Sequence, residues 1–261
     1  MLHMKTKISG CVITYNEEHN IERCLKSMIQ IVDEIIIYDS KSNDNTVDIA
    51  KKYTDKIFIT DWPGYGEQRN RAISQCKYDW ILFIDADEVL SDKLVNELYN
   101  ISLDDMDKYN IYYFKWNTYF YGKLLKHGRF SKPQHKLFNK TNVMYKMRSC
   151  HETLNITNNN TKKIVLKNPL IHYSWKDYKN FQDKYINYSL LLANEKFKAS
   201  DNTGCYYMVI AIFRFFFDFI REFFFNGSFL DGWFGFIISF NLAVYAFNKY
   251  VNLYLLNIKQ K

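Results

Sequence analysis

The first residues, MLHMK, lack the hydrophobic stretch that marks a secretory signal. The sequence also lacks paired cysteines at metal-binding spacing. The cysteines are Cys11, Cys24, Cys76, Cys150 and Cys205, an odd number. We therefore expect the protein in the cytosol. Hydrophobic residues are not scarce, and their share of 48% excludes a disordered or fibrous chain.

The chain is positively charged, but the charge does not identify its binding partner. Lysine and arginine number 35 against 28 acidic residues, which gives a formal net charge of +7. A basic protein of this kind suits an anionic partner such as nucleic acid, a nucleotide or acidic lipid, and the charge alone does not choose among them. The length of 261 residues suffices for one α/β domain with an appendage.

Short apolar runs alternate with helical patterns in the first hundred residues. The runs predict strands at 8–14, 34–39, 56–60 and 80–85, and the segments between them carry apolar residues at helical spacing. Strands that are apolar throughout and separated by helices indicate a mostly parallel sheet with helices covering both faces. The sequence therefore predicts the α/β class with a Rossmann-like arrangement.

The pattern changes twice further along the chain. Aromatic-rich strands are predicted at 111–116, 135–138, 164–166 and 170–173. A single aromatic stripe then predicts a helix with one buried face. Its members are Tyr178, Phe181, Tyr185, Tyr188 and Leu192. Two strongly apolar segments follow, at 206–225 and 229–256. We expect a domain over 1–175, in halves 1–100 and 101–175, and a helical, aromatic C-terminal extension over 176–261.

Polar side chains follow the predicted strands at the points where the strands end. They are Thr14-Tyr15-Asn16-Glu17-Glu18, Asp39-Ser40 and Asp85-Ala86-Asp87-Glu88. Ligands bind at the carboxyl ends of parallel strands, so we expect one site there. Asp85 and Asp87 are suited to share Mg²⁺ or Mn²⁺, which would hold a diphosphate, although such a pair can also cap the next helix. Asp39 is suited to a ribose or base, or to forming a turn.

In combination, these motifs resemble the inverting family 2 glycosyltransferases over roughly the first 170 residues. The resemblance implies the GT-A fold, a UDP-sugar as donor and Mg²⁺ or Mn²⁺ bound through the Asp-x-Asp motif. The implied donor-binding residues are Thr14, Tyr15, Asn16, Glu17, Asp39, Gln68, Asn70, Asp85 and Ala86. The implied metal site comprises Asp85, Asp87 and the downstream His172. For His172 a core position is the alternative.

Inverting transfer requires a base on the acceptor side, in line with the leaving diphosphate. Many family members carry Glu-Asp or Asp-Asp there, whereas this sequence has Cys150-His151-Glu152-Thr153, where a subgroup carries His-Glu. We expect Glu152 to be the catalytic base, with His151 orienting it. The alternative for Glu152 is an exposed loop carboxylate.

The tail extends the resemblance to one subgroup of the family. The run FLDGWFG at 229–235, together with His151-Glu152, resembles bacterial β-1,4-glucosyltransferases of the lipopolysaccharide inner core. The resemblance implies transfer of a hexose, glucose, to a lipid-linked saccharide at the cytoplasmic face of the inner membrane, with no nucleic-acid partner. Segment 206–225 suits a helix at a bilayer interface, while 233–247 is short for a membrane span and also suits burial against the domain.

Three alternatives remain beside this interpretation. A family 2 transferase could act on a capsule, lipid-carrier or protein acceptor instead. A non-catalytic, membrane-associated module could bind a nucleotide-sugar. A nucleotidyltransferase is disfavoured because its triphosphate loop would be glycine-rich and basic, whereas Tyr15-Asn16-Glu17-Glu18 is acidic.

Overall fold

The structure is a computed structural model that describes residues 6–101, 106, 108–141, 143–146, 154–156, 161–175, 177–198 and 206–259. The chain divides into two compact units. The first unit comprises Met1–Asn117 and Lys132–Ser174, and the second comprises Thr118–Ser131 and Trp175–Lys261. The second unit therefore combines the C-terminal helices with a hairpin taken from the middle of the chain.

The first unit holds the main sheet. Its strands are β1 (Ile8–Thr14), β2 (Glu34–Asp39), β3 (Ile57–Ile59), β4 (Trp80–Phe83), β5 (Glu88–Leu90), β6 (Ile111–Phe120), β8 (Gln134–Asn139) and β11 (Lys163–Trp175). Their order is β3-β2-β1-β4-β8-β6-β11-β5. Strands β1 to β4 pair in parallel, whereas β8 runs antiparallel to β4 and β6, and β5 runs antiparallel to β11. Strands β9 (Val143–Tyr145) and β10 (Leu154–Ile156) form a second, two-stranded sheet that packs in the core shared with α3.

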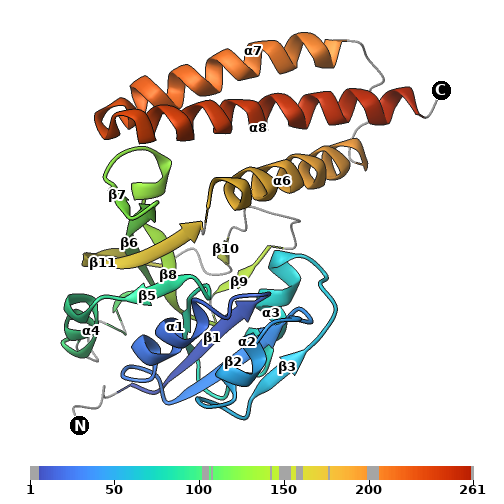
Figure 1. Cartoon of the computed structure of the whole chain (residues 1–261). Coiled ribbons are helices and arrows are strands. Elements are labelled where there is room, and N and C mark those ends of the chain that lie inside the picture. Colours follow the sequence, from blue (N-terminus) through green and yellow to red (C-terminus); the bar gives the residue numbers. More distant parts are fainter. Residues whose placement is uncertain are drawn as a thin grey trace. The chain divides into compact units, whose positions relative to one another are not determined.

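Helices cover both faces of this sheet, as the sequence predicts. They are α1 (Ile21–Met28), α2 (Thr46–Ala50), α3 (Tyr65–Ser74) and α4 (Asp92–Tyr99). Alternate residues of each strand enter different cores, since successive side chains point to opposite faces. Val12 and Ile37 pack in a core with α1, α2 and α4, whereas Cys11 and Ile36 pack with α3. The expected α/β class is confirmed, and Figure 1 shows β1, β2 and β3 among these helices.

The second unit is built on aromatic packing. Its elements are the end of β6, β7 (Lys123–Leu125), η1 (Arg129–Ser131), α6 (Tyr178–Lys198), α7 (Tyr206–Ile220), the π-helical turn η2 (Arg221–Phe225), η3 (Ser228–Asp231) and α8 (Trp233–Ile258). Phe120 and Phe130 of the hairpin segment share a core with Phe181 of α6 and with Ile238 and Leu242 of α8. Among the residues that the structure describes, no helix combines the length and the apolar character needed to span a bilayer.

Several strands differ from the sequence prediction. Strand β6 continues to Phe120, past the predicted end at 116, and β7, β9 and β10 were not predicted. The runs 164–166 and 170–173 belong to one strand, β11, which continues through Pro169. Its ladder with β5 begins only at Leu170, so the missing N–H of Pro169 costs none of those bonds. Strand β5 was not predicted, because Glu88 directly follows the Asp-x-Asp motif and the strand has only three residues.

Candidate active site

The ends of β1 and β2 bring the first two predicted side chains together. Thr14 and Asp39 are register partners in the parallel ladder. The Thr14 hydroxyl is buried and has no hydrogen-bond partner among the described residues. Asp39 is fully buried, and its carboxylate accepts hydrogen bonds from Ser42 N at 2.7 Å and Ser42 Oγ at 2.5 Å. This edge of the sheet thus contains a buried hydroxyl whose partner must come from outside the described chain.

The loop after β1 is fixed by the loop after β2. Asn16 adopts a positive φ of 54°, its N–H donates to Ser42 Oγ at 2.8 Å, and its side-chain oxygen accepts from Asn43 N at 2.9 Å. Glu17 N donates to Thr46 Oγ1 at 2.8 Å. The Tyr15 side chain, by contrast, is 57% exposed. The polar groups of Asn16 therefore hold the loop in shape and leave the Tyr15 ring accessible.

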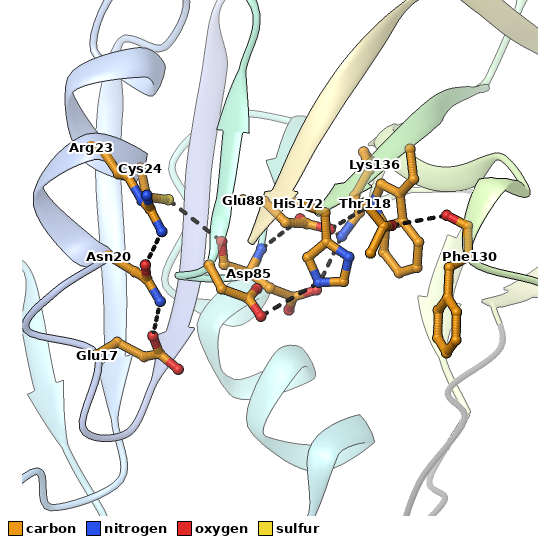
Figure 2. A network of polar contacts seen from close by, with 12 residues as sticks. Glu17, Asn20, Arg23, Cys24, Asp85, Glu88, Thr118, Phe130, Lys136 and His172 are labelled. Atoms are coloured by element: carbon orange, nitrogen blue, oxygen red, sulfur yellow. Dashed lines mark hydrogen bonds and ion pairs between the residues drawn. The ribbon is translucent and has the colours of Figure 1, made fainter. Parts of the chain in front are cut away.

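A chain of contacts links this loop to β11. Glu17 accepts a hydrogen bond from Asn20 Nδ2 at 2.6 Å, and Asn20 in turn accepts one from Arg23. The Arg23 guanidinium lies 3.5 Å from the centre of the Tyr173 ring. The N–H of Tyr173 donates to the backbone oxygen of Asp87 at 2.9 Å. Figure 2 shows Glu17, Asn20 and Arg23 along this chain.

Gln68 and Asn70 of α3 brace the surrounding strands. Gln68 is fully buried, and its Nε2 lies 3.3 Å from Ser40 Oγ and 3.2 Å from Thr60 Oγ1. Asn70 donates to Tyr145 O at 2.9 Å and accepts from Tyr145 N at 3.0 Å, so its amide pairs with the backbone of β9 in both directions. In this structure, both side chains fix elements around the strand ends.

The acidic motif after β4 forms a compact network with two cations. Asp85 pairs with Arg69 Nη2 at 2.7 Å and with Lys136 Nζ at 3.1 Å. Lys136 also pairs with Glu88 at 2.6 Å, and Glu88 accepts a hydrogen bond from Trp116 Nε1 at 2.7 Å. Figure 2 shows Asp85, Glu88 and Lys136 around this centre, with His172 beside them. Two acids and two bases thus form a group without net charge.

The environment shifts the proton affinities in this network. Burial alone would raise the pKa of the Asp85 carboxyl, but Arg69 and Lys136 hold that pKa well below its usual range. Burial raises the pKa of the Glu88 carboxyl. Burial opposes the charge of Lys136, yet Asp85 and Glu88 keep the pKa of its ammonium group above the usual value. Asp85 and Lys136 therefore stay charged over the physiological range.

Asp87 and His172 lie beside each other at the edge of this network. Asp87 Oδ2 lies 3.4 Å from His172 Nε2, and the imidazole stacks on Trp116 with ring centres 4.4 Å apart. The antiparallel pairing of β5 with β11 places His172 opposite Glu88 in the ladder, one residue after Asp87. One carboxylate and one imidazole thus face each other in a partly buried position.

One carboxylate and one imidazole are a small donor set, so a divalent cation here would also need oxygen ligands from water or from a bound diphosphate. No group of three or more histidine, cysteine or acidic side chains within the described ranges is placed to hold a metal ion. Mg²⁺ in phosphate-binding sites ordinarily takes one or two protein carboxylates, with water and substrate phosphates completing its shell. Asp87 and His172 would be the protein ligands, whereas both oxygens of Asp85 are engaged by cations.

Some predicted residues lie elsewhere, and some site residues were not predicted. Glu152, expected as the base, and His151 lie outside the described residues. Ala86 is buried between the two aspartates. Reasoning from sequence did not identify Lys136 or Trp116 as site residues. A signal existed for Lys136, since a lysine inside an apolar strand requires a buried acid to pair with.

Comparison with known proteins identifies the class to which this fold and site belong. A model of the family described as Glycosyl transferase family 2 matches residues 9–158. Because this match covers more than half of the chain, the protein belongs to that family and is a glycosyltransferase, and the α/β architecture is the GT-A arrangement expected from the resemblance.

Two relatives and one solved structure show how similar this chain is to individual glycosyltransferases. An uncharacterized glycosyltransferase of Rickettsia felis is 32% identical, with 95% of this chain and 88% of the relative covered. The lipopolysaccharide core biosynthesis glycosyltransferase LpsC of Rhizobium meliloti is 28% identical, covering 96% of this chain and 93% of the relative. Among solved structures, glucosyl-3-phosphoglycerate synthase from Mycobacterium tuberculosis with Mn²⁺ and UDP-glucose is 24% identical, covers 44% of each chain, and has a TM-score of 0.34.

Proposed function

We propose that the protein transfers a hexose, glucose, from a UDP-sugar to a saccharide of the lipopolysaccharide core, with inversion at the transferred carbon. The observation that carries this proposal is the Asp87–His172 pair, with 3.4 Å between Oδ2 and Nε2, next to the charge-balanced network of Asp85. In this proposal residues 1–100 bind the donor, 101–175 bind the acceptor, and 176–261 contact the membrane.

The donor's nucleoside would bind at the ends of β1 and β2. The buried Thr14 hydroxyl lacks a partner among the described residues, and it pairs in register with Asp39. The exposed Tyr15 ring offers a surface against which a flat base can stack. Asn16 and Glu17 would contribute by holding this loop in place.

The diphosphate would lie toward Asp87 and His172. A divalent cation held by these two side chains, Mg²⁺ or Mn²⁺, would supply positive charge where the leaving diphosphate develops negative charge. Lys136 and Arg69 hold Asp85 in one position, so this carboxylate is ready to accept a hydrogen bond from the ribose. Their positive charges also reduce the repulsion that Asp85 would exert on a diphosphate.

Glu152 would remove the proton from the attacking hydroxyl of the acceptor. The proposal for this residue rests on the His151-Glu152 pair and the subgroup that it resembles. The near full-length similarity to LpsC supports a lipopolysaccharide core acceptor, because that relative is named for core biosynthesis. A capsule, lipid-carrier or protein acceptor is the alternative within the same family.

A membrane-facing role for the extension rests on exposed aromatic side chains. Phe213 is 65% exposed, Phe216 59%, Phe225 83% and Trp233 79%. Arg214 and Arg221 lie among them on α7 and η2. Aromatic bulk accompanied by arginine suits a surface that lies in the interface of a bilayer. Such a surface would bring the protein to the cytoplasmic face of the inner membrane, where a lipid-linked acceptor lies.

The proposal is tested by incubating the protein with a panel of UDP-sugars and Mn²⁺ and measuring hydrolysis of each donor. We expect hydrolysis of UDP-glucose above the other sugars, and its loss when the metal is chelated. Binding of every donor without any hydrolysis, also when core oligosaccharide is added, would instead support a non-catalytic binding module.

The base is tested with Glu152→Gln, which keeps the size of the side chain and removes its charge. We expect transfer to fall by about 1000-fold while metal-dependent UDP binding stays unchanged, because the base acts on the acceptor. Turnover close to that of the unmodified protein would exclude Glu152 as the base.

The membrane surface is tested with the double variant Phe225→Glu/Trp233→Glu and co-sedimentation with phosphatidylglycerol-containing vesicles. We expect sedimentation to be lost while UDP-glucose hydrolysis persists. Ile29→Glu and Ile59→Glu, combined in one variant, place the same two charges on exposed apolar positions of the first unit and should leave sedimentation unchanged. Equal sedimentation of all three proteins would contradict the proposal.

A further inference from the structure

The segment 126–129, which follows β7, is held by every one of its backbone N–H groups. Lys126 N and His127 N donate to the Asp231 carboxylate at 3.2 and 3.0 Å. Gly128 N donates to the backbone oxygen of Asn226 at 3.0 Å, and Arg129 N donates to Glu222 Oε1 at 2.7 Å. The segment between α7 and α8 thus accepts a hydrogen bond from each of these four amides. We call residues 126–129 the clamped loop.

The two acids that hold the clamped loop are themselves buried. Glu222 is 1% exposed and Asp231 6%. Besides the loop amides, Glu222 accepts from Asn226 Nδ2 at 2.6 Å and Ser228 Oγ at 3.3 Å. Burying a carboxylate is costly unless several donors satisfy it. Asp231 meets two main-chain amides and the His127 ring, whereas Glu222 meets one main-chain amide, two side-chain donors and the Arg129 guanidinium at 3.5 Å. Such a hydrogen-bond network restricts the backbone to one conformation, because hydrogen bonds are more directional than apolar contacts.

Gly128 allows the close approach on which this geometry depends. Its φ is +80°, and a Cβ atom built on it would lie 2.4 Å from Ser228 Oγ and 2.7 Å from Glu222 Oε1. Both the left-handed backbone and the lack of space make a side chain at this position costly, because it would displace Glu222 or Ser228. The clamped loop therefore depends on a glycine and on two buried acids that lie about a hundred residues later in the chain.

The side chain of His127 is oriented by the same clamp. Its Nδ1 lies 3.1 Å from Asp231 Oδ1, while 37% of the side chain remains exposed. An ionised carboxylate only accepts hydrogen bonds, so Nδ1 must carry the proton in this contact. In the neutral imidazole the other nitrogen, Nε2, then has a lone pair available for a hydrogen bond. Since Nδ1 points to a buried group, Nε2 lies on the opposite side of the ring.

We propose that His127, oriented by Asp231, accepts a hydrogen bond from a hydroxyl group of the saccharide acceptor, and that the clamped loop is a preformed recognition element for that acceptor. This inference rests on the proposed transferase function. A fixed backbone and a fixed tautomer reduce the ordering needed on binding, which favours recognition of a polyhydroxylated ligand. His127 is a binding residue in this scheme, and Asp231 is a positioning residue.

The test compares His127→Phe with His127→Gln, using deacylated lipopolysaccharide core oligosaccharide as the probe. Phenylalanine keeps the ring but removes both nitrogens, whereas glutamine keeps a polar group near the position of Nε2. We expect His127→Phe to weaken binding of the oligosaccharide, and to raise its KM, by about 10-fold, with partial recovery in His127→Gln. Hydrolysis of UDP-glucose in the absence of acceptor should stay unchanged in both variants.

Asp231→Asn separates positioning from mere folding. The amide can donate to Nδ1 and so permits the other tautomer, in which Nε2 carries the proton. We expect the KM for the oligosaccharide to rise without a matching fall in kcat, and hydrogen exchange of the amides at 126–129 to accelerate. A variant that only loses thermal stability, with an unchanged acceptor KM, would overturn the positioning role.

Two results would overturn the inference without touching the transferase function. The first is equal oligosaccharide binding by the unmodified protein and His127→Phe. The second is the absence of oligosaccharide binding by the unmodified protein while UDP-glucose hydrolysis persists. Loss of donor hydrolysis in the unmodified protein, by contrast, counts against the proposed function itself, and direct binding of the oligosaccharide still decides the role of His127.

Discussion

Two groups of buried acids, one in each unit, are satisfied in different ways. In the first unit Asp85 and Glu88 meet the ammonium group of Lys136, at 3.1 and 2.6 Å. In the second unit Glu222 and Asp231 meet backbone N–H groups of the clamped loop. Paired side-chain charges can redistribute when a charged ligand arrives, whereas acids bound by main-chain amides fix the path of the chain. The first arrangement can adjust to a charged ligand such as the diphosphate of the proposed donor. The second keeps the clamped loop in one conformation.

The largest effect is expected at Asp87, whose carboxylate faces the imidazole of His172. Asp87→Ala should reduce transfer by about 1000-fold and weaken metal-dependent UDP binding, because it removes a metal ligand of the proposed site. Turnover and UDP titration with and without Mn²⁺ measure both effects. The matched control is Asp79→Ala, which removes a carboxylate that is 62% exposed just before β4. Equal activity in both variants would place Asp87 among the structural acids.

The next effect concerns stability in the first unit. Lys136→Met keeps much of the side-chain volume but leaves Glu88 and Asp85 without a shared cation, and Glu88 is fully buried. We expect the free energy of unfolding to fall by about 3–5 kcal/mol, the cost of a buried charge that has lost its partner. Adding Glu88→Gln should recover part of this loss in denaturant titrations. Lack of recovery would mean that Lys136 stabilises the fold by packing alone.

A smaller effect is expected from glycine substitutions in the hairpin of the second unit. Gly128 and Gly122 both have positive φ, +80° and +71°, but only at Gly128 would a Cβ meet other atoms within 4 Å. Gly122→Ala should cost about 1 kcal/mol from backbone strain, and Gly128→Ala about 3 kcal/mol because overpacking is added. Thermal unfolding measures both. Equal losses would argue that the clamp is looser than its distances indicate.

The smallest effect is a pH dependence near the charged network. Burial, together with the cations Lys136 and Arg69, lowers the pKa of His135 to about 3. Between this value and the unfolded pKa of about 6.5, the unfolded chain binds a proton that the native state does not bind, so stability falls as the pH drops.

His135→Gln removes this titration. We therefore expect the variant to lose about 2 kcal/mol less than the unmodified protein between pH 7 and pH 5, as measured by urea unfolding at both values. Parallel pH profiles for the two proteins would show that another group governs the acid sensitivity.

The sequence predicts the first unit better than the second. The runs 8–14 and 34–39 coincide with β1 and β2, because a strand buried on both faces is a continuous apolar segment with polar residues at its ends. The parallel arrangement also follows from the sequence, since helices separate these strands. The hairpin 118–131 could not be assigned to the C-terminal helices, because Phe120 and Ile238 meet across more than a hundred residues.

The candidate site was predictable in its outline only. Thr14, Asp39 and Asp85 were placed at strand ends by their position after apolar runs, and the structure brings these strand ends to adjacent strands of one sheet. The pairing of Asp85 with Lys136 was not predictable, because a lysine inside an apolar strand indicates that it pairs with a buried acid but does not identify which one. The role of Glu152 stays a prediction, since this residue lies outside the described ranges.

The division of the chain into units has a consequence for protein engineering. The chain passes from one unit to the other after residues 117, 131 and 174. In sequence these points lie within a few residues of Trp116, Lys136 and His172 of the candidate site. A chimera that exchanged only the residues after 174 for those of a relative would pair a foreign helical turn with the native clamped loop. Both segments of the second unit, 118–131 and 175–261, must therefore be exchanged together.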